Sequence, residues 1–382
     1  GTTGEIKSYA VYNYQSEFKT GANAVITTSA AGNVDNSNVN AWAVINQDNS
    51  QTTFGDNVKI QARASESGLS VAVLNQTDSI VDFEGSLYVD GEGFSLYSTG
   101  GAVTNALAAG KDKILIGDMY SNSDGQINVL LDTADSLGAA LIGTAGGEIN
   151  FTMSDLSLWR MLGDSSVTAL AVSSGAIVDM TQYDDYQQLE ISELSGSGGE
   201  FIMKTDLASE TDGDKLYVTD AAAGTSQFVQ VNDVSIINGA VVTGDKKLLL
   251  ITDASKNVEF IGKNLNNGGL WDITPTLENG LAVGGSEEEW YLTKLRKEAN
   301  NDTSVLLGAA DNAYAMWRNT NDTMRQRLGD LRHNKINEGD GLWTRYTGGR
   351  FGGSGLDSRY NMYQLGYDKT VNAKSTYGVA LE

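Results

Sequence analysis

Three short units of turn and strand follow one another in the sequence: Leu194-Ser-Gly-Ser-Gly-Gly-Glu-Phe-Ile-Met203, Gly213-Asp-Lys-Leu-Tyr-Val218 and Gly224-Thr-Ser-Gln-Phe-Val-Gln-Val231. Each unit begins at a turn that contains glycine and continues as a brief apolar strand. A strand this short cannot bury its own apolar surface, so each must be covered by its neighbour in a stack. The stretch therefore predicts a β-solenoid.

Similar short strands, separated by Gly, Asn and Asp, precede these units. Their expected anchors recur at intervals of 22 to 29 positions, at Val58, Leu87 and Ile114 and at Ile127, Ile149 and Ile177. Such a period is typical of one β-helix rung built from three strands. Asn46, Asn75 and Asn105 follow apolar runs, and we expect their amides to cap corners or form ladders between rungs, with ligand contact as the alternative.

Composition supports a regular all-β stack. The 382 residues include 44 Gly, 1 Pro and no Cys. Few prolines suit a sheet, because proline removes a ladder hydrogen bond. The absence of cysteine excludes disulfides, thiolate catalysis and cysteine-bound metals. The formal net charge of −23 repels phosphate backbones, so we expect no nucleic-acid partner.

The order of the motifs resembles the C-terminal passenger region of pertactin-like and AIDA-like type V autotransporters. The three units are followed, as in that family, by Trp290-Tyr-Leu292, Arg327-Leu-Gly-Asp-Leu-Arg332, Leu342-Trp-Thr-Arg345 and Gln364-Leu-Gly-Tyr-Asp368. The resemblance implies an all-β fold: a right-handed parallel β-helix with a C-terminal autochaperone cap, then a linker α-helix and the strands of a truncated β-barrel.

Four parts are therefore expected: β-helix rungs over 1–188, the autochaperone cap over 189–299, the linker helix over 300–339 and the first strands of the β-domain over 340–382. In the family, the cap segment folds first and templates the rungs stacked on it. A large apolar residue at a solenoid end covers the last rung. We assign core or cap roles, rather than ligand contacts, to Phe201, Leu216, Tyr217, Phe228, Trp271 and Trp290.

Apolar spacing becomes helical between Asn300 and Arg332, with Asp311 as the expected N-cap. Some relatives cleave themselves at an Asn-Asn pair within this helix. Alignment on the arginine-rich end places Asp322 and Thr323 there, which makes them the candidate processing position, although the replacement of both asparagines argues against that mode of cleavage.

Alternating residues follow the helix in Leu342–Tyr346 and Asn361–Asp368, and a third strand is expected from Ser375 to Ala380. In the second strand the larger apolar side chains fall on one face and the polar ones on the other. That alternation suits lipid outside and water inside an outer-membrane barrel, but three strands cannot close a pore.

Patterns for catalysis or metal binding are incomplete. Gly163-Asp-Ser-Ser166 resembles the nucleophile motif of serine proteases, but its last glycine is missing, and His333 is the only histidine. We expect solvated turns at Asp206, Asp212, Asp214 and Asp220, with weak calcium binding as the alternative. The Tyr183–Tyr186 stretch is expected to be a solvated loop rather than a paired-carboxylate site, because adjacent strand residues face opposite ways.

The resemblance implies a surface-displayed, non-enzymatic adhesin or self-association module whose C-terminal segment drives folding during secretion. Its partners would be host glycans or proteins, or sister passengers, and its anchor would be the outer membrane through the full-length protein's β-domain. We expect no catalytic residue, cofactor or metal. The alternative is a surface glycan-processing or other hydrolase whose active residues lie on the N-terminal rungs or upstream of Gly1, since the chain looks like part of a longer precursor.

Overall fold

The protein is mostly β-structure in the computed structural model. The structure describes residues 5–31, 38–65, 68–133, 139–237, 246–265, 270–306, 308–311, 313–314, 317, 339–353, 356–372 and 375–381. The chain divides into two compact units, Gly1–Leu265 with Ile273–Arg296, and Asn266–Asp272 with Lys297–Glu382.

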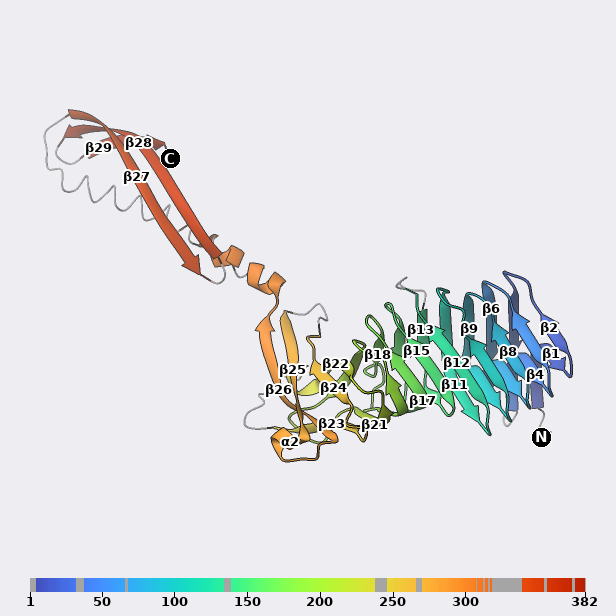
Figure 1. Cartoon of the computed structure of the whole chain (residues 1–382). Coiled ribbons are helices and arrows are strands. Elements are labelled where there is room, and N and C mark those ends of the chain that lie inside the picture. The colour runs from blue at the N-terminus through green and yellow to red at the C-terminus, as the bar shows by residue number, and fades with distance from the viewer. Residues whose placement is uncertain are drawn as a thin grey trace, which may run out of the picture. The chain divides into compact units, whose positions relative to one another are not determined.

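Two long sheets build the first unit, and their strands stack rung upon rung (Figure 1). In the described residues, one sheet comprises β1 (Glu5–Tyr14), β3 (Val25–Ala30), β4 (Asn38–Gln47), β6 (Val58–Ala64), β7 (Leu69–Gln76), β9 (Leu87–Thr99), β11 (Lys113–Asn122), β13 (Ala139–Ile142), β14 (Ala145–Gly146), β16 (Leu158–Arg160), β18 (Ile177–Asp179), β20 (Glu200–Thr205), β22 (Thr225–Asp233) and β24 (Val258–Gly262). The other comprises β2 (Glu17–Lys19), β5 (Gln51–Phe54), β8 (Ile80–Phe83), β10 (Val103–Ala106), β12 (Gln126–Leu131), β15 (Ile149–Met153), β17 (Ser165–Val172), β19 (Gln188–Ser195), β21 (Lys215–Ala221), β23 (Leu248–Asp253), β25 (Trp271–Asn279) and β26 (Glu289–Ala299).

Consecutive rungs pair in parallel. Val58 lies opposite Leu87, and Ile127 opposite Ile149, as the sequence intervals predict. The strands enclose one continuous apolar core in which Phe54 stacks on Phe83 at 4.9 Å between ring centroids. The predicted all-β parallel β-helix is confirmed.

Two of the expected strand anchors are wrong. Leu87 lies opposite Lys113, not Ile114, and Lys113 is the buried residue of the two. Its ammonium group donates to the carbonyl oxygens of Ala108 and Lys111, at 2.5 and 3.1 Å, which offsets its burial. Ile177 pairs in the other sheet from Ile149, so that interval joins no pair of neighbours.

Strand direction reverses at the end of the stack. The last parallel pair in the second sheet is β21 with β23, and β26 then pairs antiparallel with β23, Trp290 lying opposite Ile251. Strands β25 and β26 are joined through α2 (Gly280–Val283), where the side chain of Asn279 accepts from the amide of Leu281. A second short helix, α1 (Val234–Ile237), follows β22. The reversed strands cover an edge that would otherwise expose unpaired backbone groups.

The second unit contains helical residues and an antiparallel sheet of β27 (Gly339–Gly353), β28 (Leu356–Asn372) and β29 (Ser375–Leu381). The helical residues begin at Asn301, and the side chain of Asn300 accepts from the amide of Thr303 at 2.8 Å, so Asn300 is the N-cap. The predicted N-cap at Asp311 is wrong, because Asp311 is itself helical. The rest of the predicted helix, including Asp322 and Thr323, lies outside the described residues. No helix among the described residues is both long and apolar enough to cross a membrane.

Candidate binding face

The sequence-predicted cap residues lie in different surroundings. Phe201 and Leu216 are fully buried, whereas Phe228 is half-buried beneath the ammonium group of Lys263. Trp290 packs edge-on against Phe260, at 5.7 Å between centroids. Trp271 is 45% exposed and lies under Lys297. Tyr217 is 37% exposed on β21, so its expected core role is wrong. These placements leave the proposed folding role a prediction.

Asparagine side chains form a ladder inside the solenoid. Asn13 donates to Asn46, and Asn46 to Asn75, each with 2.9 Å between nitrogen and oxygen, and all three residues are buried. Asn75 in turn donates to the hydroxyl of Thr104 at 3.1 Å. The expected role of Asn46 and Asn75 in ladders between rungs is confirmed.

A second ladder follows the 12-stranded sheet. Asn105 donates to Asp82, Asn128 to Asn105 and Asn150 to Asn128, at distances from 2.8 to 2.9 Å. These residues lie opposite one another in register and are half-buried. Asn105 therefore also forms a ladder, but one that water can reach.

The predicted solvation of the acidic residues is confirmed in one place and wrong in another. Residues 182–186, which include Tyr183, Asp184, Asp185 and Tyr186, form an exposed loop. Asp214 is fully buried and accepts from the amides of Gln187 and Lys204. Burial raises its pKa to about 6. Among the described residues, no cluster of three carboxylates or histidines has metal-binding geometry.

Strand β7 is buried on both of its faces. Val71 and Leu74 lie in an apolar cluster separate from the main core, with Ile45 as its third buried member. The half-buried rings of Trp42, Phe94 and Tyr97 pack against this cluster. Burial on both faces explains the continuous apolar run in β7, where a half-exposed strand would alternate.

Aromatic side chains gather around this outer cluster, on strands β1, β4, β9 and β11. We call this set the aromatic face; it consists of Tyr9, Tyr12, Tyr14, Trp42, Phe94, Tyr97 and Tyr120. Tyr9, Tyr12 and Tyr14 are 56%, 51% and 46% exposed, and Tyr120 is 39% exposed. Apolar patches that stay in contact with water are typical of interaction surfaces.

Register aligns the aromatic face, apart from Tyr14, whose partner is Gln47, into two columns. In the first column, Tyr12, Ile45, Leu74, Tyr97, Tyr120 and Gly146 are successive partners across the rungs. In the second, Tyr9, Trp42, Val71, Phe94 and Asp118 are successive partners. The sequence alone does not predict this face, because which residues lie opposite one another across the rungs depends on the length of each corner between them.

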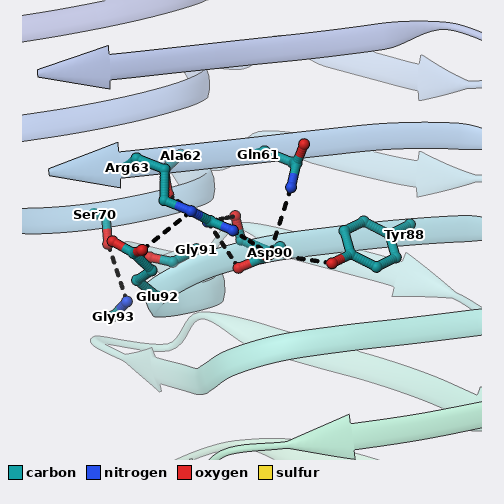
Figure 2. A network of polar contacts seen from close by, with 9 residues as sticks. All are labelled: Gln61, Ala62, Arg63, Ser70, Tyr88, Asp90, Gly91, Glu92 and Gly93. Atoms are coloured by element: carbon teal, nitrogen blue, oxygen red, sulfur yellow. Dashed lines mark hydrogen bonds and ion pairs between the residues drawn. The ribbon is translucent and has the colours of Figure 1, made fainter.

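A charged network fixes the corner of β9 that precedes Phe94. Figure 2 shows the guanidinium of Arg63 paired with the carboxylate of Asp90, with 2.8 Å between Nη1 and Oδ1, and its Nε paired with Glu92 at 3.1 Å. The hydroxyl of Tyr88 donates to Asp90 at 3.2 Å. Burial alone would raise the pKa of Asp90, but the hydrogen bonds and charge of Arg63 hold it below the usual range.

The same corner requires glycine at position 91. A Cβ atom at Gly91 would lie 1.7 Å from the carbonyl oxygen of Phe94. The first half of β9 pairs with β6 and the second with β7, so the chain changes direction here between two sides of the solenoid. The corner thereby sets where Phe94 and Tyr97 join the aromatic face.

Stacked parallel rungs, an inner amide ladder and an outer aromatic face define the first unit as a parallel β-helix. Residues 167–294, from β17 into β26, match the family model described as Pertactin. The resemblance to pertactin-like autotransporter passengers, which the motifs indicate, is confirmed over this stretch.

Two curated relatives and one solved structure are similar to this chain. Autotransporter CRAC of Citrobacter rodentium is 27% identical over 246 residues, covering 57% of this chain and 14% of CRAC. The autotransporter adhesin/invasin TibA of Escherichia coli is 28% identical over 227 residues, covering 57% of this chain and 21% of TibA. The crystal structure of the Haemophilus influenzae Hap adhesin aligns with a TM-score of 0.40 and 13% identity, covering 75% of this chain and 33% of that one. The chain thus spans about a seventh to a fifth of the curated relatives it matches.

Proposed function

We propose that this passenger is a surface-displayed, non-enzymatic adhesin or self-association module. The observation that carries the proposal is the aromatic face, where Tyr9, Tyr12, Tyr14 and Tyr120 are in contact with water. Tyrosine and tryptophan are enriched at protein interfaces, because they combine a large apolar area with a polar group. The relative TibA is an autotransporter adhesin/invasin, which supports the same function.

The net charge determines how association through this surface depends on salt concentration. With a formal charge of −23, two copies repel each other over roughly a Debye length, about 8–10 Å at physiological salt. Self-association through the aromatic face would therefore strengthen as salt rises. A host glycan or protein would be bound with little salt dependence if it is uncharged.

Surface display through the outer membrane is part of the proposal, because the relatives are autotransporters. In the antiparallel sheet of the second unit, Leu342, Tyr346, Tyr363, Leu365 and Tyr367 are exposed, whereas the intervening Gln364 and Gly366 are buried. An apolar outer face with polar residues on the other side supports the interpretation of these strands as the start of a translocator domain. Residues 189–299 would act as the autochaperone cap that directs folding of the rungs.

Adhesion is tested with beads coated with the full chain. Attachment to epithelial monolayers reports host binding, and clustering of beads at low and high salt reports self-association. The double variant Tyr9→Ser/Tyr12→Ser should lose most of either activity, whereas Tyr183→Ser, an equally exposed tyrosine in the acidic loop, should retain it. The proposal fails if coated beads neither attach nor cluster more than uncoated ones, or if the double variant behaves as the unaltered chain does.

A further inference from the structure

Beyond Tyr120 the outer surface of the solenoid becomes hollow. A groove of about 470 Å³ is lined by residues of β9, β11, β14, β17 and β19, among them Phe94, Tyr120, Gly146, Ser166 and Glu190. A smaller hollow of about 180 Å³ continues from it past Ser166 and Glu190 to Tyr217. We propose that this groove binds an uncharged oligosaccharide, which is the ligand class through which the adhesin proposed above would recognise a glycan.

The groove exists because side-chain size drops abruptly along the first aromatic column. Tyr120 is followed by its partner Gly146, and the neighbouring strand β17 contributes Ser166. A Cβ atom at Gly146 would lie 3.3 Å from the ring carbon Cδ2 of Tyr120, so a larger side chain there would displace that ring. From Tyr120 to Glu190 the hollow crosses about three rung spacings of 4.7–4.9 Å, or roughly 14 Å.

One end of the groove is aromatic. Tyr120 packs edge-on against Tyr97 with 5.4 Å between centroids, and Phe94 lies 6.0 Å from Tyr120. These contacts hold the ring of Tyr120 in place while leaving 39% of the residue exposed. A rigid, exposed ring offers an apolar platform to the C–H face of a sugar ring, and it loses little conformational entropy on binding.

The sides of the groove carry fixed hydrogen-bond acceptors. One oxygen of Asp118 accepts from the amide of Thr144 at 2.7 Å, and one oxygen of Asp164 accepts from the amide of Gln188 at 2.8 Å. Each carboxylate is thereby oriented, and its second oxygen remains available to a ligand. Sugar hydroxyl groups donate charge-assisted hydrogen bonds to such carboxylates, and the side-chain amide of Gln188, which also lines the groove, can both donate and accept.

The negative charge of the groove determines whether it can bind anionic or neutral sugars. Asp118, Asp164 and Glu190 line the same groove in a chain of net charge −23, so sialylated, sulphated or phosphorylated ligands are repelled. A purely apolar ligand would leave the carboxylates desolvated without partners. A neutral oligosaccharide, with alternating apolar ring faces and hydroxyl groups, satisfies both the aromatic end and the acidic sides.

The test uses the full chain and tetrasaccharides of glucose, galactose, mannose and N-acetylglucosamine, with sialylated and sulphated oligosaccharides of equal length for comparison. Binding is measured by saturation-transfer NMR and by calorimetric titration. Tyr120→Ala should weaken binding about tenfold through loss of the aromatic platform, and Ser166→Trp should abolish it by filling the groove. Tyr183→Ala, at an exposed tyrosine of the acidic loop outside the groove, is the matched control and should bind as the unaltered chain does.

Binding of at least one neutral tetrasaccharide with this pattern of variants supports the proposal. It is overturned if no neutral tetrasaccharide binds, if binding survives Ser166→Trp in a chain with an unchanged melting transition, or if the anionic oligosaccharides bind as tightly. Bead attachment that persists without sugar binding would overturn the groove assignment alone and leave the adhesin function standing.

Discussion

Replacing Asn46 with alanine should destabilise the N-terminal rungs far more than the size of the side chain suggests. Asn46 is fully buried, and its amide nitrogen donates to Asn75, Ile80 and Ser50, at 2.9, 2.9 and 3.2 Å. Its oxygen accepts from Asn13 and Thr52, at 2.9 and 2.8 Å. The substitution removes all five hydrogen bonds from the middle of the inner ladder.

The magnitude follows from the groups that lose a partner. Asn13 and Thr52 keep a hydrogen bond to each other, whereas the side-chain oxygen of Asn75 and the carbonyl of Ile80 each lose one inside the solenoid. Each buried polar group without a partner costs about 1–3 kcal/mol. We therefore expect a loss of about 3–5 kcal/mol, close to the whole stability of many domains.

Urea titration followed by circular dichroism gives the overall change, and hydrogen exchange of the β4 and β7 amides shows whether these rungs open locally, since solenoid rungs can unfold one after another. Asn150→Ala is the matched control, because Asn150 donates one ladder hydrogen bond of 2.8 Å from a half-buried site. Its loss should amount to about 0.5–1.5 kcal/mol. Equal effects of the two substitutions would refute the reasoning that buried, multiply bonded amides hold the rungs in register.

Three further predictions concern other parts of the first unit. Burial raises the pKa of Asp214 from 3.8 to about 6, so the folded state binds a proton more tightly than the unfolded state does. The free energy of unfolding should therefore fall by up to about 3 kcal/mol as pH rises from 4 to 7. Asp214→Asn should flatten this dependence in melting curves measured across that range. Leu216→Asp should abolish cooperative unfolding of the stack, because it places a charge in the core, and an unchanged calorimetric transition would contradict the assigned core role. Gly91→Ala should lower the melting temperature and weaken bead attachment together, because a Cβ atom 1.7 Å from the carbonyl oxygen of Phe94 forces this corner of β9 to move. Unchanged attachment by a destabilised chain would show that the corner does not position the aromatic face for binding.

The repeating rung could be predicted because it depends on properties that a sequence displays. Glycine turns, short apolar strands and asparagines after apolar runs indicate a solenoid with amide ladders, and Asn46, Asn75 and Asn105 all form ladders. The order of motifs indicated a resemblance to pertactin-like autotransporters, and residues 167–294 match the Pertactin family model.

Three of the wrong predictions share a physical origin, since each involves a polar group whose partner is remote or unrecognised in the sequence. Lys113 is buried because nearby carbonyl oxygens satisfy its ammonium group. Asp214 is buried because the amides of Gln187 and Lys204 converge on it from two other places in the chain. Asn300 caps the helix eleven residues before the expected Asp311, since the cap depends on local backbone geometry rather than on the apolar period.

The inner ladder and the outer aromatic column depend on the same register. Tyr12 precedes Asn13, Ile45 precedes Asn46 and Leu74 precedes Asn75, so each outer residue sits beside an inner one. Because neighbouring strand residues face opposite sides, a slip by one position would bring the apolar side chains inward and expose the amides. The ladder penalises that slip, since an amide on the outside no longer meets the amides of adjacent rungs. Stability and binding are therefore coupled in these rungs: a substitution that lets β4 shift against β7 would break the aromatic columns even though no aromatic residue has changed.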